Sequence, residues 1–333
     1  TTEIYTLSLH DALPISLVLA EKPSVGRDIA RVLRCNKKGN GYLEGDRHIV
    51  TWALGHLVTL AEPEDYDKRY KAWRIEDLPM LPSDLKLVTI RQTSRQYNAV
   101  KQQMYRRDVR DIIIATDAGR EGELVARWII KKANVNKPLK RLWISSVTDK
   151  AIRDGFNKLR DGKEYENLYA SAVARAEADW IVGINATRAL TCKYNAQLSC
   201  GRVQTPTLTM IAKREEEIQN FKPRDFYGIT AMAKNLKLIW QDSSTKNFRT
   251  FDKDKCDKSL AAIKNKNAEV TGIDKVSKKS YSPKLYDLTE LQRDANRIFG
   301  FSAKETLSIM QKLYETHKLL TYPRTDSRFI TTD

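Results

Sequence analysis

Four acidic residues, Glu21, Asp117, Glu121 and Glu123, directly follow two apolar runs of the sequence. If those runs are neighbouring strands, the carboxylates meet at one edge of a sheet and repel one another unless a cation sits among them. Mg²⁺ is the natural occupant, because it takes oxygen ligands and keeps waters that a phosphate can replace. Acidic capping of a helix N-terminus, worth about 0.3–1 kcal/mol, is the competing interpretation. The separate position of Glu21 favours the metal, with Glu21, Asp117 and Glu121 as ligands.

A tyrosine and an arginine, in the run Tyr322-Pro323-Arg324, form a second candidate reactive group. A phenol with a pKa of about 10 is a poor nucleophile at neutral pH. Covalent catalysis therefore needs a nearby cation that stabilises the phenolate and the phosphoryl charge. Arg324 is two residues away, and Pro323 stiffens the backbone between them. By itself, the same tripeptide is more often a turn with a surface tyrosine.

A third stretch, SCGRVQTP from Ser199 to Pro206, combines backbone and side-chain donors. Gly201 permits a close approach of the backbone to a phosphate. Arg202 and Gln204 offer donors to phosphates and base edges. By itself, this pattern also fits a loop with a surface arginine.

Two strand–turn–helix units must position the acidic residues. Residues 17–20 are apolar and are followed by a turn and a helical pattern up to residue 33, and residues 111–116 lead in the same way into a helical pattern up to residue 130. Both runs are continuous, which is typical of strands buried on both faces of a parallel sheet. Open sheets of this kind place their sites at the carboxyl ends of the strands.

The rest of the chain changes character twice. An Ala-rich helical periodicity dominates after residue 150, and short β-type runs follow at 226–230, 236–240 and 269–273. The opening residues lack the basic start and apolar core of a secretory signal. We therefore expect a multidomain chain that combines an α/β domain, an α domain and a small β domain. The expected segments are a foreign or disordered extension (1–16), the α/β domain (17–150), a helical domain (151–222), a β-rich domain (223–280) and the start of a tyrosine-bearing domain (281–333).

The composition limits the kinds of molecule that the protein is expected to bind. The 333 residues hold 58 Lys and Arg against 42 Asp and Glu, a net charge of +16, with 41% hydrophobic residues, which argues against disorder or a fibre. A basic surface of this size favours a polyanion. Because no run approaches the roughly 20 apolar residues of a membrane span, nucleic acid is favoured over a membrane. The four cysteines show no CxxC pair and no zinc-ligand spacing, as in a reduced cytosolic chain.

The acidic pattern resembles a known domain. The sequence Glu21-Lys-Pro-Ser after the first run, with a D-x-D-x-E element after the later one, is similar to the Toprim domain of topoisomerases, primases and some nucleases. One position departs from it, since Gly119 stands where the second Asp usually falls. The resemblance then implies one Mg²⁺ held by Glu21 and Asp117, with Glu121 or Glu123 nearby.

The tyrosine motif extends the resemblance. Residues 321–327, TYPRTDS, resemble the active-site signature of type IA DNA topoisomerases, and residues 199–204 resemble that family's S-x-G-R-V-Q element. All three elements occur in the family's order, and their residues are most like those of the bacterial topoisomerase III branch. The resemblance implies an N-terminal Toprim domain with a Rossmann-like parallel sheet. Helical and β domains of topoisomerase IA would follow, and the chain would be truncated in the tyrosine-bearing domain.

The resemblance also implies a mechanism. Tyr322 would attack a phosphodiester of single-stranded DNA, leaving a 5′-phosphotyrosyl link and a free 3′-hydroxyl, followed by strand passage and religation. Arg324 would stabilise the phosphoryl charge, Lys22 would steady the phosphate or protonate the departing oxygen, and Glu21 would share that proton transfer. Relaxation of negative supercoils and decatenation would need no ATP, in agreement with the lack of a P-loop motif.

The implied DNA contacts lie along a track for the single strand. Arg175 and Asp179 equally fit a surface ion pair, and His56 equally fits a core histidine. Trp73 and Trp180 either stack on bases or pack between domains. The implied contact residues are His56, Arg175, Asp179, Arg188, Ser199, Gly201, Arg202, Val203, Gln204 and Arg324.

The implied protein is a monomeric isomerase of the bacterial cytoplasm, associated with the nucleoid and not with a membrane. Chains of the family continue well past the tyrosine, whereas this one ends at Asp333. We therefore expect weak relaxation, or none, from these 333 residues. The competing hypothesis is a Toprim-containing nucleic-acid-binding fragment, or a nuclease or primase relative, in which Tyr322 does no chemistry.

Overall fold

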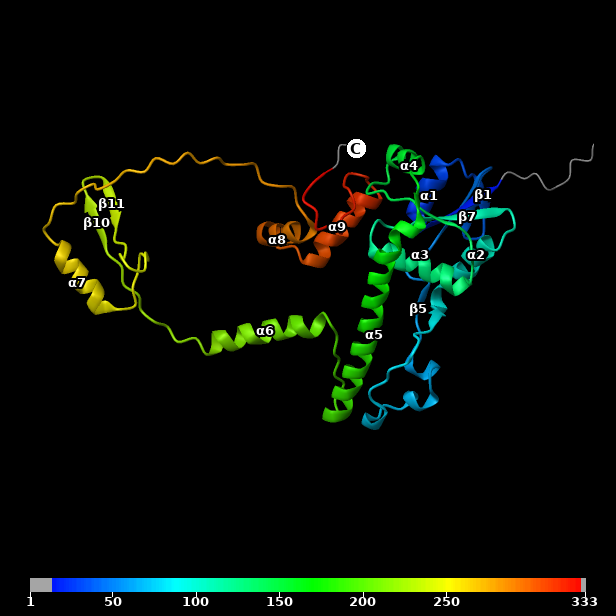
Figure 1. Ribbon diagram of the computed structural model, residues 1–333, viewed down its shortest axis with the longest axis horizontal. Coiled ribbons are helices and arrows are strands. Elements are labelled where there is room, and N and C mark those ends of the chain that lie inside the picture. Colours follow the sequence, from blue (N-terminus) through cyan, green and yellow to red (C-terminus); the bar gives the residue numbers. More distant parts are fainter. Residues whose placement is uncertain (1–13, 331–333) are drawn as a thin grey trace, which may run out of the picture. The chain divides into compact units, whose positions relative to one another are not determined.

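The computed structural model describes residues 14–330. Within them the chain forms two compact units, one made of residues 14–204 with 284–330 and the other of residues 205–283 (Figure 1). Most of the predicted extension, 1–16, lies outside the described residues. Its last two residues, Ile15 and Ser16, already belong to the first strand.

Seven strands of the first unit form one mixed sheet, in the order β2-β3-β4-β1-β7-β8-β9. The four central strands are parallel, and antiparallel strands flank them on both sides. The continuous apolar runs thus form the neighbouring strands β1 and β7, which confirms the predicted parallel sheet. The strands are β1 (Ile15–Ala20), β2 (Lys37–Gly39), β3 (Tyr42–Glu44), β4 (His48–Trp52), β7 (Val109–Ala115), β8 (Leu139–Arg141) and β9 (Arg160–Asp161).

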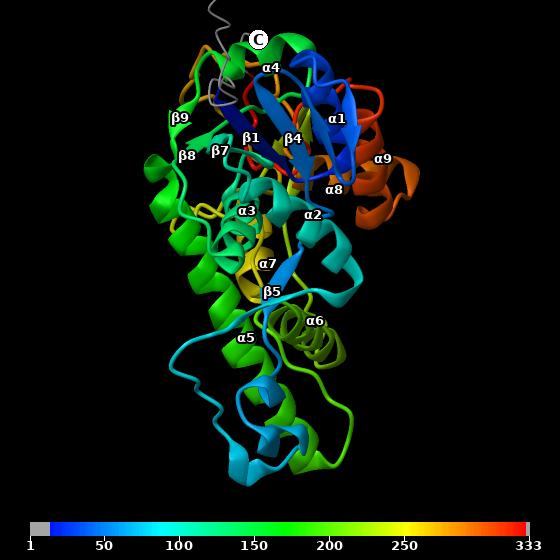
Figure 2. The ribbon, with the colours of Figure 1, turned by 90° about the vertical axis from the view of Figure 1, so that its right-hand side faces the viewer.

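Helices cover both faces of this sheet, because successive strand residues point to opposite sides. Leu17 and Leu19 of β1 pack in a core with residues of α2 and α3, whereas Val18 and Ala20 pack with residues of α1 and α4 (Figure 2). The result is a three-layer α/β/α arrangement. The helices are α1 (Pro23–Val32), α2 (Ser94–Met104), α3 (Arg120–Ala133) and α4 (Asp149–Phe156).

A long segment packs along α5 (Glu166–Tyr194). It connects β5 (Val58–Leu60) to β6 (Leu87–Thr89), which pair antiparallel. Asn185 of α5 accepts a hydrogen bond from the backbone N–H of Met80 at 2.6 Å and donates one to its carbonyl at 3.0 Å. Trp180 donates its indole N–H to the carbonyl of Ala61 at 2.9 Å. The segment thereby holds α5 beside the α/β core.

The chain returns to the first unit through α8 (Leu288–Phe299) and α9 (Ala303–Glu315), which pack on each other. Gly300, with a φ of +72°, makes the left-handed turn between them. After α9, the backbone N–H of Tyr322 donates to the carbonyl of Ser145 at 3.1 Å. This bond ties the tyrosine segment to the loop that follows β8.

The second unit is small. It contains most of α6 (Gln204–Gln219), the hairpin of β10 (Thr230–Ala233) and β11 (Leu236–Ile239), and α7 (Lys253–Ile263). The strand predicted at 236–240 is confirmed, but the one predicted at 269–273 is wrong. No described strand pairs with residues 269–273, and a strand needs such a neighbour to satisfy its backbone groups.

No helix within residues 14–330 is both long and apolar enough to cross a lipid bilayer.

Candidate functional site

The carboxylates of Glu21 and Asp117 lie at the carboxyl edge of the central sheet. They follow β1 and β7, which are hydrogen-bonded neighbours with Ala20 opposite Ala115. The backbone N–H of Asp117 donates to Oε2 of Glu21 at 3.1 Å. The structure therefore brings together the two residues on which the predicted metal site depends.

Burial and mutual repulsion disfavour the charged forms of these two carboxylates. Burial, together with the charge of Asp117, raises the pKa of Glu21 to about 7. Burial also raises the pKa of Asp117, while the charge of Lys22 opposes that rise. Both shifts favour a proton or a cation beside the two carboxylates.

The other two acidic residues of the motif are engaged elsewhere. Glu121, about half exposed, forms an ion pair with Arg175 at 3.1 Å. Glu123 is fully buried and pairs with Arg141 at 2.6 Å and with Arg127 at 2.8 Å. Among residues 14–330, no three or more His, Cys, Asp or Glu side chains cluster as they would around a metal ion. The carboxylate oxygens of Glu21 and Asp117 are ligands that fit Mg²⁺. Glu121 pairs with Arg175 instead of joining them.

Tyr322 lies in the same cavity as this acidic pair. The cavity has a volume of about 580 Å³, and its lining includes Glu21, Asp117 and Tyr322. The hydroxyl of Tyr322 and the carboxylate of Asp117 lie close enough in this cavity that each changes the pKa of the other. Burial and the charges of Asp117 and Glu21 raise the pKa of Tyr322 above its usual value, and Arg324 opposes the shift. The Tyr322 hydroxyl is therefore protonated in this arrangement.

Two cations predicted to act in catalysis also line the cavity. Arg324 lies near enough to lower the pKa of both Glu21 and Asp117 by its charge. Lys22 forms an ion pair with Glu315 of α9, at 2.6 Å. The structure thus assembles all four predicted catalytic residues, with the amine of Lys22 held by a carboxylate.

Some predicted DNA contacts line the cavity with them. His56 packs edge-on against Trp128, with 6.4 Å between ring centroids. Arg175 and Asp179 extend the lining along α5. Arg202 of the third motif does not itself line the cavity, but it forms an ion pair at 3.0 Å with Asp179, which does.

Other predicted contacts lie outside the cavity lining. Arg188 donates to the carbonyl of Tyr70 at 2.6 Å and lies over the ring of Trp73, whose side chain is half exposed. Trp180 has a packing role, since it also contacts Tyr66 edge-on. The remaining predicted contacts that do not line the cavity are Ser199, Gly201, Val203 and Gln204.

Reasoning from sequence missed three residues of α9 that line the cavity, Gln311, Tyr314 and Glu315, and the last two contact predicted catalytic residues. Tyr314 is buried against Tyr322, with 5.8 Å between ring centroids, and Glu315 holds Lys22. Both lie at the end of an amphipathic helix just before the motif. That position was the only signal that could have marked them.

Two family matches cover most of the chain. Residues 16–147 match the Toprim domain, and residues 163–333 match the DNA topoisomerase family, which is more than half of the sequence.

The chain belongs to the DNA topoisomerase family.

Individual relatives of this topoisomerase-family chain agree with the match. DNA topoisomerase 3 of Bacillus subtilis (strain 168) is 70% identical over 318 residues, which are 96% of this chain and 44% of that protein. DNA topoisomerase 3 of Bacillus licheniformis is 69% identical over 318 residues, with the same coverage. The chain therefore spans less than half the length of these curated relatives. The family prediction, with its likeness to bacterial topoisomerase III, is confirmed.

The fold agrees as well. Full-length topoisomerase I from Thermotoga maritima superimposes with a TM-score of 0.64 at 25% identity, covering 95% of this chain and 50% of that one. The predicted fold class, a Toprim sheet followed by topoisomerase IA domains, is confirmed.

Proposed function

We propose that this chain carries the DNA-cleaving site of a type IA DNA topoisomerase, an enzyme of the isomerase class. The observation that supports this best is the single cavity in which the side chain of Tyr322 lies with Glu21, Asp117 and Arg324. A turn with a surface tyrosine, the alternative interpretation of the motif, would not place the hydroxyl there.

The proposed step exchanges one phosphodiester for another. The oxygen of Tyr322 bonds to a phosphorus of single-stranded DNA, and the bond from that phosphorus to the 3′-oxygen breaks. The product is a 5′-phosphotyrosyl link with a free 3′-hydroxyl, and the reverse step reseals the strand. Because the bond energy is kept in the link, strand passage needs no ATP.

The side chains supply the protons and the charge. Asp117, whose charge acts on the Tyr322 hydroxyl within the same cavity, takes the proton of that hydroxyl, with Glu21 beside it. Lys22 is the donor for the departing 3′-oxygen once Glu315 releases its amine. Arg324 offsets the phosphoryl charge as it develops.

Mg²⁺ is the proposed cofactor, with Glu21 and Asp117 as its ligands. When bound, the ion would supply positive charge that offsets the repulsion between the acidic pair and a DNA phosphate. Glu121 is the proposed third ligand, and it can serve only after leaving Arg175.

Single-stranded DNA is the proposed partner. The net charge of +16 supports it, as do Arg175 in the cavity lining and Arg202, which pairs with Asp179 of that lining. We further propose a monomer that acts at the nucleoid in the bacterial cytoplasm, in relaxation or decatenation.

Adduct trapping tests the proposal. The chain would be fused to the C-terminal part of the Bacillus subtilis relative, incubated with labelled single-stranded DNA and Mg²⁺, and stopped with SDS. We expect a covalent protein–DNA adduct that Tyr322→Phe abolishes. Tyr314→Phe, at the neighbouring ring, is the matched control and keeps the adduct.

Two results would contradict the proposal. Hydrolysed DNA without an adduct would indicate a nuclease or primase relative, and binding without cleavage would indicate a binding fragment. The 333 residues alone are expected to relax negatively supercoiled plasmid weakly or not at all, because they span 44% of the relatives' length.

A further inference from the structure

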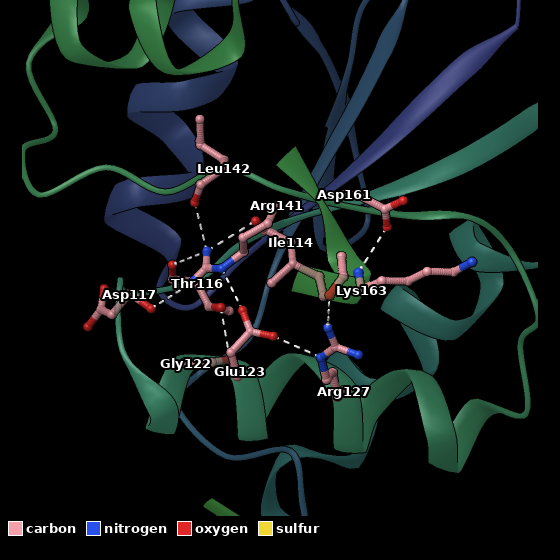
Figure 3. A network of polar contacts seen from close by, with 11 residues as sticks. Ile114, Thr116, Asp117, Gly122, Glu123, Arg127, Arg141, Leu142, Asp161 and Lys163 are labelled. Carbon is pink, nitrogen blue, oxygen red and sulfur yellow. Dashed lines mark hydrogen bonds and ion pairs between the residues drawn. The ribbon is translucent and has the colours of Figure 1, made fainter. Parts of the chain in front are cut away.

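Arg141, at the end of β8, is fully buried. Its guanidinium donates to four backbone carbonyls (Figure 3). Nη2 donates to the carbonyl of Asp117 at 2.7 Å. Nη1 donates to the carbonyls of Leu142 at 2.7 Å, Thr116 at 2.8 Å and Ile114 at 3.1 Å.

These carbonyls belong mainly to the end of β7 and the loop that carries Asp117. The loop is closed further by a hydrogen bond from the Thr116 hydroxyl to the carbonyl of Gly122, at 2.8 Å. It is also very tight, since a Cβ at Gly122 would lie 2.1 Å from the carbonyl oxygen of Asp117. Any change in the donors to these carbonyls therefore acts on the backbone of Asp117.

Glu123 offsets the free-energy cost of burying the Arg141 guanidinium. Its carboxylate is also fully buried and lies 2.6 Å from Nε of Arg141. A buried charge without such a partner is strongly destabilising. The rings of Trp143 and Tyr165 complete the surroundings, 4.9 Å and 6.0 Å from the guanidinium carbon. Glu123 is therefore occupied as a counter-ion and is not free to bind a metal.

We propose that Arg141, neutralised by Glu123, is a positioning residue that fixes the Asp117 backbone and thereby the geometry of the Glu21–Asp117 carboxylate pair. This inference rests on the proposed function in one respect, namely that the pair binds a divalent cation. Its structural part, the fixing of the loop, stands independently of that. The glutamates at 121 and 123 thus have different roles, one at the cavity and one beneath it.

The test removes the Arg141 guanidinium together with its buried counter-ion, while Arg127 keeps its bond to the carbonyl of Gly162. In the double variant Arg141→Met/Glu123→Leu, apolar side chains of similar size replace the ion pair, an exchange that often leaves stability intact. Two quantities are measured on the 333-residue chain. They are amide hydrogen exchange in residues 116–123 and the dissociation constant for Mn²⁺ by calorimetry, with thermal unfolding to verify the fold.

We expect faster exchange in residues 116–123 and a Mn²⁺ dissociation constant raised by about 10- to 100-fold, as for other residues that orient metal ligands. Lys137→Met is the matched control. Lys137 donates to the carbonyls of Arg106 and Val109, at the opposite end of β7, so its loss should change neither quantity.

Loop exchange like that of the parent, in a folded double variant, would overturn the proposal. If the double variant does not unfold cooperatively, Arg141→Lys replaces it. A lysine keeps the charge opposite Glu123 but cannot supply the fork of donors to four carbonyls, so faster loop exchange is again expected. If the parent itself binds no Mn²⁺, the proposed metal role fails, while the exchange measurement still decides on Arg141.

Discussion

The Tyr322 hydroxyl lies where its ionisation is opposed. Burial and two carboxylates raise its pKa, and Lys22 of the same cavity is held by Glu315. An incoming phosphate would meet Arg324 but would also meet the acidic pair. If Tyr322 acts as the proposed nucleophile, the described arrangement is therefore a resting one, in which its hydroxyl is positioned but not activated.

Releasing Lys22 should therefore speed cleavage. Glu315→Gln removes the charge that holds the amine, in a partly exposed ion pair of the kind worth about 0.2–1 kcal/mol. We expect single-turnover cleavage by the fused chain to rise about 1.4- to 5-fold. Glu305→Gln, in the first turn of the same helix, is the control. An unchanged or slower rate for Glu315→Gln would show that the pair does not restrain Lys22.

The two glutamates of α3 should differ sharply in their effect on stability. Glu123→Gln leaves Arg141 buried without its counter-ion and should lower the free energy of unfolding by about 3–5 kcal/mol. Glu121→Gln changes a half-exposed side chain and should stay within about 0.5 kcal/mol. Urea titrations of both variants measure the difference. Equal effects would contradict the assignment of Glu123 as the buried counter-ion.

This difference shows where reasoning from residues stops. Glu121 and Glu123 are alike in type and lie two positions apart, yet residues i and i+2 of a helix face different directions. Helical geometry predicts that they diverge. Which of them is buried depends on Arg141. That residue lies on β8, and nothing in the sequence marks it as the partner of a glutamate in α3.

At the scale of elements, β1 and β7 were predictable because their apolar runs are continuous and each ends in a polar turn. The segment 61–86 was not predictable, because it is held to α5 by bonds such as those between Asn185 and Met80. No local pattern reports such distant partners. The wrong prediction of a strand at 269–273 has the converse cause. Those residues have the local pattern of a strand, but no described strand pairs with them.

The start of β4 should give the fold a pH dependence. Burial, assisted by the charge of Arg47, lowers the pKa of His48. A histidine with a lowered folded-state pKa supports the fold above its unfolded value of about 6.5, and that support is lost as the pH falls.

We therefore expect the parent to lose more free energy of unfolding between pH 7 and pH 5 than the variant His48→Gln, as measured by urea titration at each pH. His317→Gln, at an exposed position, should follow the parent. Coincident curves for the parent and His48→Gln would count against the prediction.

At the scale of the molecule, Tyr322 lies beside the sheet only because the chain leaves the first unit and later rejoins it. Residues 205–283 form a separate unit, and residues 284–330 rejoin the first. The order of the motifs predicts that they act together but not which contacts hold them. Lys318 provides one such contact, an ion pair with Asp28 of α1 at 2.7 Å.

Breaking that contact should expose the nucleophile. In Lys318→Met we expect nitration of Tyr322 by tetranitromethane, followed by mass spectrometry, to rise about 1.4- to 5-fold, in line with a partly exposed ion pair. Arg153→Met is the matched control, since it removes a partly exposed ion pair to Asp149 within α4, at 3.4 Å, and does not touch Asp28. Equal nitration in both variants would mean that Lys318 does not help to dock the tyrosine segment.

Gly119 carries a consequence for how this site evolves. Its backbone is extended, with a φ of −176°, and a Cβ added there would meet no atom within 4 Å. Any glycine codon becomes an aspartate or glutamate codon by changing its second base. A further carboxylate beside Asp117 is thus one base change away, and its Cβ would meet no steric clash.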